Sequence, residues 1–340
     1  MPVETLDRES LRKWAGERLG RTFHAAEPMT GGGSRRRYVR LRDGDGSVVG
    51  VLTDDRREMR AFLAYTRHFA ARGIPVPAIL AEDLGRGVYV LQDLGDETLA
   101  ARLAVWRGER DGAARVMAAL TQVVGWLARI QVRGGEGLDY SLSPEGGRQD
   151  AVAYRDDVTL FLTHYVPARA PQAAPSAAQR EALETLIERV AALPAETFCY
   201  RDFQARNIMW VQGGPVFLDY QHGRRGPLAY DLASLLFSPD TGATPGQREG
   251  LIEAYLAALG EVGVHPAPAA FRVGFNAVVL LRRLQALGAY VRIATEKQAP
   301  AYLEKIPPAL ETLRGLRAAG HLDFGLPALD DWLEVLLRRT

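Results

Sequence analysis

The segment that decides the fold comprises residues 198–237 and reads FCYRDFQARNIMWVQGGPVFLDYQHGRRGPLAYDLASLLF. Its polar beginning carries a carboxylate at Asp202 and an amide at Asn207, five residues later. Two apolar runs follow, at residues 208–211 and 215–218. Apolar runs of this length on either side of glycines are typical of paired strands. The segment therefore predicts a polar loop followed by a β-hairpin.

The predicted hairpin would bring a second carboxylate back to the polar loop. A two-residue turn at Gly213 and Gly214 would reverse the chain, so Asp219 at the end of the second run returns to the side of the loop. A carboxylate base near a substrate hydroxyl, with a carboxylate and an amide that bind Mg²⁺, is what phosphoryl transfer from a nucleotide requires. We therefore predict Asp202 as the catalytic base and Asn207 and Asp219 as metal ligands.

These motifs resemble those of the aminoglycoside phosphotransferase and choline kinase superfamily, the small-molecule relatives of protein kinases. The corresponding elements here are Y-R-D at residues 200–202, D-Y-Q at residues 219–221 and G-P-L-A-Y-D-L-A at residues 226–233. Within the superfamily, the R-D-F-x-x-R-N loop and the D-Y-Q before the G-P run are most similar to bacterial cell-wall sugar kinases. Those kinases act on N-acetylmuramate and N-acetylglucosamine.

The resemblance implies an α+β fold, namely the two-lobed protein-kinase-like fold. The N-lobe, expected over residues 1–91, would hold an antiparallel sheet, one main helix and a glycine-rich turn. The larger, mostly helical C-lobe, expected over residues 92–340, would hold the hinge, the catalytic loop, the metal site and the acceptor pocket. ATP and Mg²⁺ are the implied cofactors.

Hydrophobic periodicity predicts secondary structure that fits this plan. Strands are expected at residues 23–29, 36–42, 48–53, 79–82 and 88–92. Helices are expected at residues 6–19, 59–70, 97 to about 130, 150–165, 177–192, 245–259, 267–293, 300–319 and 327–337, with a Pro/Ala-rich loop at 167–175. The chain thus predicts a strand-rich beginning and a helical remainder.

A glycine-rich turn at residues 30–34 lies between the first two predicted strands. Glycines there would let the backbone approach phosphates and offer N–H groups to them, although a plain hairpin turn is the alternative. The predicted nucleotide contacts in and after this turn are Gly32, Gly33, Ser34 and Arg37. The resemblance adds Gln92 and Leu94, in the hinge whose backbone contacts the adenine of the nucleotide.

The third predicted strand, residues 48–53, departs from the kinase plan because it contains no lysine. In protein kinases a lysine on this strand binds the phosphates and pairs with a glutamate of the following helix. Glu58 occupies the position of that glutamate and is included among the nucleotide-binding residues. Either an arginine of residues 35–37 supplies the positive charge, since its fork suits phosphate oxygens, or phosphate binding relies on metal and backbone.

Polar residues beside the loop are candidates for acceptor binding and for support of the loop. Gln204 and Arg206 flank the predicted base, and Gln221 stands where some relatives carry a second acidic group. Asp231 opens a predicted helix and is expected to accept hydrogen bonds from the loop backbone. The helical regions 113–192 and 271–283 are expected to wall the acceptor pocket.

The sequence therefore favours a kinase that moves the γ-phosphate of ATP to a hydroxyl of a small molecule. By resemblance, an amino sugar of the N-acetylmuramate or N-acetylglucosamine type is the favoured acceptor. An aminoglycoside kinase, a choline-type kinase and a weakly active nucleotide-binding pseudokinase with a regulatory role are the alternatives. The pseudokinase is retained as an alternative because the third predicted strand has no lysine.

Composition limits the other classes of partner. The 340 residues are 47% hydrophobic with a formal net charge of +1, and the basic residues are scattered, which argues against nucleic acid. No run reaches the ~20 apolar residues of a membrane span. The single cysteine, Cys199, excludes an internal disulfide and favours a reducing compartment. We expect a soluble cytoplasmic enzyme that binds a nucleotide and a small-molecule acceptor, with no membrane or obligatory protein partner.

Overall fold

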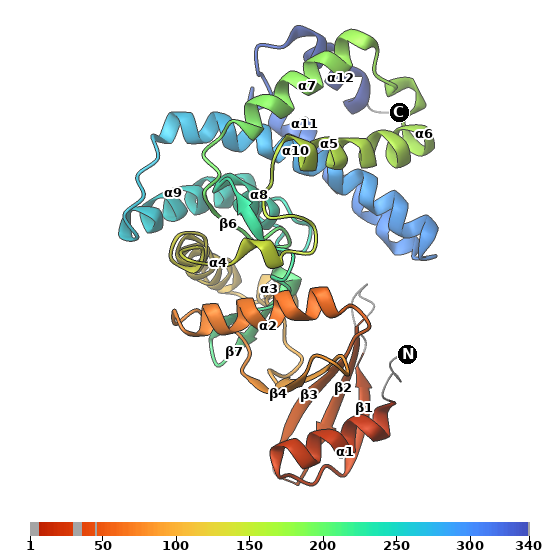
Figure 1. Ribbon diagram of the computed structural model, residues 1–340. Coiled ribbons are helices and arrows are strands. Elements are labelled where there is room, and N and C mark those ends of the chain that lie inside the picture. Colours follow the sequence, from red (N-terminus) through yellow and green to blue (C-terminus); the bar gives the residue numbers. More distant parts are fainter. Residues whose placement is uncertain (1–6, 30–35, 45, 339–340) are drawn as a thin grey trace. The chain divides into compact units, whose positions relative to one another are not determined.

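The computed structural model describes residues 7–29, 36–44 and 46–338, which form two compact units (Figure 1). Unit 1 comprises Met1–Ala119, Arg133–Gly147 and Arg206–Gly223. Unit 2 comprises Leu120–Val132, Arg148–Ala205 and Arg224–Thr340. The chain passes between the units within the segment that decides the fold, so Asp202 belongs to unit 2, while Asn207 and Asp219 belong to unit 1.

Unit 1 is built on a five-stranded antiparallel sheet. Its strands are β1 (Ala25–Met29), β2 (Arg37–Arg42), β3 (Ser47–Leu52), β4 (Ile79–Asp83) and β5 (Val88–Gln92), in the spatial order β1-β2-β3-β5-β4. Each strand is antiparallel to its neighbours. The five predicted strands are confirmed, with their ends moved by one or two residues. The glycine-rich turn with Gly32, Gly33 and Ser34 lies outside the described residues.

Helices α1 (Arg8–Leu19) and α2 (Arg56–Ala70) cover opposite faces of this sheet. Successive side chains of a strand point to opposite faces. On β5, Val90 belongs to the core cluster that contains Leu11 and Trp14 of α1. The neighbouring Tyr89 turns the other way, and its ring centroid lies 5.4 Å from that of Phe62 on α2. The helix that carries Glu58 is thereby fixed to one face of the sheet.

The hairpin of the deciding segment is present, but its turn is one residue earlier than predicted. Strands β7 (Ile208–Val211) and β8 (Gly214–Phe217) are antiparallel, with Val211 opposite Gly214. The turn residues are therefore Gln212 and Gly213, with φ angles of 50° and 81°. Positive φ at both central residues matches a type I′ turn, which suits the twist of the flanking strands. Gln212 takes the left-handed position that we had assigned to a glycine.

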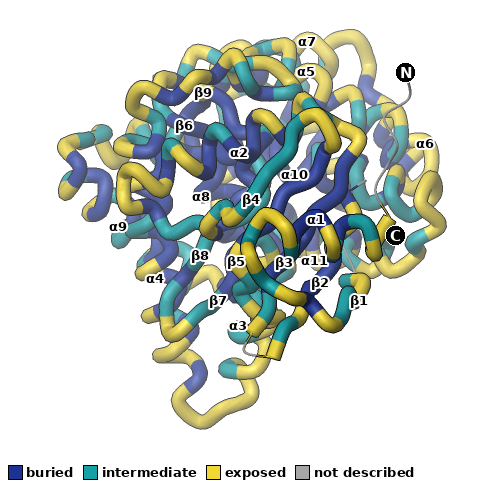
Figure 2. The backbone as a smooth tube through the Cα atoms, turned by 60° about the horizontal axis from the view of Figure 1, so that its bottom comes forward, coloured by how far each residue is buried: buried dark blue, intermediate teal, exposed yellow. Residues whose placement is uncertain are grey.

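Unit 2 is mostly helical and is organised around α10, whose middle is buried (Figure 2). Its long helices are α5 (Ala151–Leu160), α7 (Ala177–Ala191), α8 (Ala229–Leu236), α9 (Pro245–Glu261), α10 (Pro268–Glu296), α11 (Ile306–Ala318) and α12 (Pro327–Leu337). Of the two helices that precede them in the chain, α3 (Leu99–Arg107) belongs to unit 1, and α4 (Gly112–Arg129) begins in unit 1 and ends in unit 2. Helix α4 continues into the π-helical turn η1 (Ile130–Gly134). The antiparallel sheet and the helical remainder confirm the predicted α+β fold.

Two short strands pair within unit 2. Strand β6 (Thr197–Cys199) precedes the loop that carries Asp202, and Cys199 is fully buried in it. Its antiparallel partner, β9 (Arg224–Gly226), was not predicted. A three-residue strand with two arginines has no apolar alternation from which it could be recognised. The pairing fixes the start of the loop that carries Asp202.

The predicted loop at residues 167–175 is wrong, because it contains α6 (Val166–Arg169) and the 3-10 turn η4 (Pro171–Ala173). Pro167 and Pro171 each stand in the first turn of a helical element, where the missing N–H is tolerated. Before them, the predicted helix at residues 150–165 ends in the π-helical turn η3 (Phe161–Tyr165). Among residues 7–29, 36–44 and 46–338, no helix has the length and apolar content needed to cross a membrane.

Candidate active site

The hairpin brings the backbone of the two predicted metal ligands together in unit 1. Ile208 pairs with Phe217, and the N–H of Leu218 donates to the carbonyl oxygen of Asn207 at 3.0 Å, so the ladder continues past the last strand residues. Asp219 follows Leu218 directly. Its φ of 69° lies in the left-handed region, which costs a non-glycine residue about 1–2 kcal/mol. Such strain is typical of positions where a side chain must point in one direction.

Asn207 and Asp219 offer an amide oxygen and a carboxylate, which are the hard oxygen ligands that Mg²⁺ prefers. The Asp219 side chain keeps 40% of its surface exposed, so a ligand can reach it. No group of three or more His, Cys, Asp or Glu side chains forms a metal cluster among the residues that the structure describes. The pair thus fits the chemistry of a magnesium ion that is shared with phosphate oxygens.

A second acid and a buried arginine adjoin Asp219. The Arg36 guanidinium forms an ion pair with Glu58 of α2, and its Nη2 lies 3.4 Å from Oδ1 of Asp219. Gln221 bridges the same two acids, because its Nε2 donates to Asp219 Oδ1 at 2.9 Å and to Glu58 Oε1 at 3.0 Å. The Arg36 side chain is only 6% exposed. One cation and one amide therefore hold two carboxylates at the end of the hairpin.

His222 completes the surroundings of Glu58. Its Nε2 lies 3.4 Å from Glu58 Oε1, and its Nδ1 lies 3.5 Å from a carboxylate oxygen of Glu145. The hydrogen bond with His222 and the charge of Arg36 lower the pKa of Glu58 to about 2, against burial, which raises it. Glu58 is therefore ionised at neutral pH and forms an ion pair with Arg36.

In unit 2, a buried carboxylate holds the loop just before Asp202. Asp231, in the first turn of α8, accepts hydrogen bonds from the backbone N–H groups of Tyr200 at 2.7 Å and Arg201 at 2.9 Å. The side-chain amide of Gln131 donates to it at 3.1 Å. Burial raises the pKa of Asp231 to about 6, although these three hydrogen bonds lower it. The contacts are those expected of a residue that supports the loop.

Arg201 directs its side chain into unit 2. Its backbone φ is 79°, the left-handed region again. Its Nη1 donates to Gln149 Oε1 at 2.7 Å and to the Tyr230 hydroxyl at 2.8 Å, and lies 3.5 Å from Asp157 Oδ2. Burial raises the pKa of Asp157, while the charge of Arg201 lowers it. Asp202 follows directly in the chain and is partly buried.

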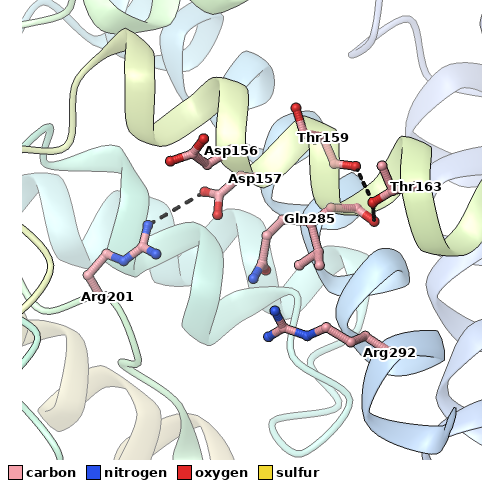
Figure 3. Close-up of a pocket in the computed structure, with 8 residues that line it drawn as sticks. Asp156, Asp157, Thr159, Thr163, Arg201, Gln285 and Arg292 are labelled. Atoms are coloured by element: carbon pink, nitrogen blue, oxygen red, sulfur yellow. Dashed lines mark hydrogen bonds and ion pairs between the residues drawn. The ribbon is translucent and has the colours of Figure 1, made fainter. Parts of the chain in front are cut away.

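An open cavity of about 370 Å³ lies beside Arg201 within unit 2 (Figure 3). Its wall is formed by α5, η3, α10 and the arginine of the loop. The lining residues are Asp156, Asp157, Thr159, Leu160, Thr163, Arg201, Gln285 and Arg292. The volume falls in the range of about 300–1,000 Å³ that is typical of small-molecule sites. Both predicted wall regions, 113–192 and 271–283, lie in or next to the helices that form it.

The remaining predicted site residues are spread over both units. Arg37 is exposed at the start of β2, and Gln92 is exposed at the end of β5, where its N–H donates to the carbonyl of Ala78 at 2.9 Å. Leu94 is partly buried, as is Gln204 after the predicted base. Arg206 is exposed on the 3-10 turn η5 (Ala205–Asn207).

Some residues of the site were missed. Arg36, rather than Arg37, is the arginine of residues 35–37 that joins Glu58 and Asp219. The alternation of side chains along a strand could have identified Arg36. Arg36 lies on the same face of the sheet as residues 38 and 40, whereas Arg37 lies on the face of Val39, which packs in the core beneath α1. No sequence signal marked Asp157 or Arg292, since single charged residues in helices are usually solvated.

Taken together, the antiparallel sheet, the helix glutamate paired with an arginine and the loop–hairpin–helix segment define a kinase-like phosphotransferase. The sequence profile of the phosphotransferase enzyme family (APH) matches residues 25–272, and the chain belongs to this family. Membership confirms the predicted class of enzyme and implies ATP as the phosphoryl donor.

Curated relatives share one name. The chain is 27% identical over 266 residues to the N-acetylmuramate/N-acetylglucosamine kinase of Caulobacter vibrioides, which covers 73% of this chain and 67% of the relative. It is 26% identical over 323 residues to the N-acetylmuramate/N-acetylglucosamine kinase of Pseudomonas putida, with coverage of 90% and 91%. The similarity to these kinases extends over most of both chains.

Solved structures of other kinases share the fold. The choline kinase LicA from Streptococcus pneumoniae superposes with a TM-score of 0.59 at 12% identity, covering 91% of this chain and 98% of that one. The amicoumacin kinase hAmiN, in complex with AMP-PNP, Ca²⁺ and Ami, gives a TM-score of 0.60 at 13% identity, with coverage of 90% and 93%. These comparisons confirm the predicted kinase-like fold.

Proposed function

We propose that the protein is a Mg²⁺-dependent kinase that transfers the γ-phosphoryl group of ATP to a hydroxyl of an amino sugar. The observation that supports the proposal is that the hairpin pairs the backbone of Asn207 with that of Leu218, the residue before Asp219, while Asp219 also contacts Arg36, which pairs with Glu58. The names of the curated relatives support N-acetylmuramate or N-acetylglucosamine as the acceptor. We further propose that it works in the cytoplasm, where ATP is available.

Unit 1 would bind the nucleotide. Asn207 and Asp219 would hold Mg²⁺, which neutralises charge on the phosphates when bound. Arg36 would take the place of the missing third-strand lysine, because its guanidinium forms the glutamate pair expected of that lysine and its fork matches phosphate oxygens. The residues that we propose as further nucleotide contacts are Gly32, Gly33, Ser34, Arg37, Gln92 and Leu94.

Unit 2 would activate the acceptor. Asp202 would accept the proton of the acceptor hydroxyl as the new O–P bond forms and the bond to the leaving ADP breaks. Asp231 would position this loop through the N–H groups of Tyr200 and Arg201. Gln204 of unit 2 is proposed as an acceptor contact, as is Arg206, which belongs to unit 1 together with Gln221. Gln221 is proposed to orient Asp219. No covalent enzyme intermediate is involved.

The proposal is tested by measuring ADP release with ATP, Mg²⁺ and four acceptors: N-acetylmuramate, N-acetylglucosamine, an aminoglycoside and choline. We expect turnover with the amino sugars and a loss of about 10³-fold in kcat for Asp202→Asn, the usual scale of a general base. Turnover only with the aminoglycoside or with choline would show that the acceptor is not an amino sugar of this type. ATP binding without transfer to any acceptor, and without effect of Asp202→Ala, would favour a pseudokinase.

A further inference from the structure

The cavity of unit 2 has two walls of different chemistry. The ligand inferred for it below rests on the proposed function. Helix α5 and the turn η3 contribute two acids and two threonine hydroxyls, including Asp157 and Thr163. Helix α10 contributes Gln285 and Arg292, seven residues apart and therefore on one face of the helix. The cavity thus offers acidic groups on one side and a guanidinium on the other (Figure 3).

The two walls are held close together by a glycine. Gly288 lies on α10 between Gln285 and Arg292, and a Cβ added to it would lie 2.7 Å from the carbonyl group of Leu160 and from Cα of Phe161. Real Cβ atoms do not approach backbone this closely. Only glycine therefore allows α10 to contact the α5–η3 junction, and the width of the cavity is fixed by backbone packing.

Asp157 lacks a hydrogen-bond donor on its inner oxygen. The residue is 7% exposed, and Oδ2 has no hydrogen-bond partner among the described residues, although it lies 3.5 Å from Arg201. A buried acceptor left in this state costs about 1–3 kcal/mol. A hydroxyl or an acetamido N–H of a bound sugar would supply the missing donor, because Asp157 lines the cavity.

Arg292 is an available cation at the other wall. It is exposed, it lines the cavity, and it makes no ion pair or hydrogen bond with any residue that the structure describes. The other arginines near the cavity are occupied: Arg201 binds Gln149 and Tyr230, and Arg282 donates to Gln285 at 2.8 Å. Figure 3 shows the Arg292 side chain reaching back along α10 toward Gln285. A guanidinium in this state suits a ligand carboxylate, which it can bind through two hydrogen bonds.

We propose that the cavity is an acceptor subsite for a hexosamine that carries a carboxylate, with Arg292 binding the carboxylate and Asp157 accepting hydrogen bonds from the sugar. N-acetylmuramate carries a lactyl carboxylate on the sugar ring, and N-acetylglucosamine does not. Arg292 therefore raises the specificity of the enzyme for the acidic sugar, whereas Asp157 serves both sugars.

The experiment compares Arg292→Gln with the wild-type protein, using kcat/KM for N-acetylmuramate and for N-acetylglucosamine. The matched control is Arg180→Gln, because Arg180 is an exposed arginine of α7 in the same unit and does not line the cavity. We expect Arg292→Gln to lower the ratio of the two values about tenfold, as removal of one charge-assisted contact at an exposed site does. Higher salt should reduce the wild-type ratio, and Arg180→Gln should leave it unchanged.

An equal loss for both sugars, or no change in the ratio, would overturn the assignment of Arg292. Titration calorimetry with N-acetylmuramate alone separates this inference from the proposed function. If no sugar is phosphorylated but N-acetylmuramate binds and Arg292→Gln weakens binding about tenfold, the kinase proposal fails and the subsite stands. If the wild-type protein binds N-acetylmuramate no better than N-acetylglucosamine, the subsite is wrong.

Discussion

The two units each contain an arginine paired with an acid from a helix, and the two acids respond in opposite ways. In unit 1, Arg36 pairs with Glu58, and the pKa of Glu58 falls to about 2. In unit 2, Arg201 pairs with Asp157, and the pKa of Asp157 rises because of burial. The presence of an arginine is therefore not what decides the ionisation of the acid.

Burial and hydrogen bonding together account for the difference: burial has the largest influence on the pKa of Asp157, whereas the hydrogen bond with His222 has the largest influence on the pKa of Glu58. Glu58 is contacted by Arg36, Gln221 and His222, so its charge is well satisfied. The buried Asp157 has an oxygen, Oδ2, that lies 3.5 Å from Arg201 and has no hydrogen-bond partner among the described residues. A complete cluster stabilises a fixed geometry, whereas an incomplete one gains from a ligand. The Glu58 cluster of unit 1 is thus complete without a ligand, whereas the proposed sugar subsite of unit 2 leaves an acceptor for a ligand.

The largest expected effect comes from the carboxylates of the deciding segment, one from each unit. Asp219→Asn and Asp202→Asn should each lower kcat by about 10³-fold or more, because the first would remove the charge of a proposed metal ligand and the second would remove the proposed base. Only Asp219→Asn should also weaken Mg²⁺-dependent binding of ATP. Initial rates and calorimetric titration with a non-hydrolysable nucleotide measure the two effects.

The control for both variants is Asp331→Asn, an exposed aspartate of α12. It should leave rates and nucleotide binding unchanged. If Asp202→Asn weakened nucleotide binding as strongly as Asp219→Asn does, the proposed division of roles between the two units would be wrong.

A buried acid of unit 2 provides the next largest effect, on stability. The pKa of Asp231 is about 6 in the folded protein against an ordinary 3.8, so between these values the folded state binds more protons than the unfolded state. Stability from this group is full below pH 3.8 and falls as pH rises toward 6, by about 2–3 kcal/mol. Urea unfolding from pH 4 to 7 should show this loss in the wild type relative to Asp231→Asn.

Unit 1 should show the opposite dependence. The folded pKa of Glu58 lies below its ordinary 4.5, so its stabilisation is full above pH 4.5 and is lost as pH falls toward 2. Solvent screening limits this term to less than ~2 kcal/mol. If Glu58→Gln and Asp231→Asn altered the pH dependence in the same direction, the contrast between the two clusters would be refuted.

Much of the fold follows from local sequence. The helix predicted at residues 327–337 matches α12, because Pro327 marks its first turn and the leucines that follow keep a helical period. Sequence could not reveal the π-helical turn η3 or strand β9. A single π turn inserts only one residue into a helix, which is too short a change for the apolar pattern to reveal, and β9 exists only through its pairing with β6.

The candidate site also contains residues that the sequence could predict and residues that it could not. Asp202, Asn207 and Asp219 lie within one segment, so their order in the chain was enough to assign them roles. Their partners come from distant elements: Arg36 is 183 residues from Asp219. Asp157 and Arg292 form part of a cavity only because α5 and α10 pack together, and no spacing in the sequence encodes that contact.

The close approach of these two helices gives a smaller, testable effect in unit 2. Gly288→Ala should destabilise the protein by about 1–3 kcal/mol, because the added methyl group meets backbone that cannot move away easily. It should also raise KM for the acceptor more than KM for ATP. Thermal unfolding and steady-state kinetics measure both effects.

The matched control is Gly315→Ala in α11, where a Cβ would meet nothing within 4 Å. Replacing an unrestrained helix glycine by alanine should stabilise the protein by about 0.5–1 kcal/mol. Two Gly→Ala changes in helices of one unit should therefore act in opposite directions. Stabilisation by both would show that α10 and η3 are not tightly packed at Gly288.

The smallest effect is expected at the hairpin turn of unit 1. Gln212 has a φ of 50° and precedes Gly213, so Asn-Gly at these positions would fit the type I′ turn better than Gln-Gly does. Gln212→Asn should stabilise the protein by roughly 0.5 kcal/mol, since asparagine adopts the left-handed region more readily, while Gln212→Ala should not. The turn lies at the opposite end of the hairpin from Asn207 and Asp219. Urea unfolding should therefore detect the gain while kcat stays unchanged, and a change in kcat would mean that the turn, and not the Arg36–Glu58 cluster, sets the position of Asp219.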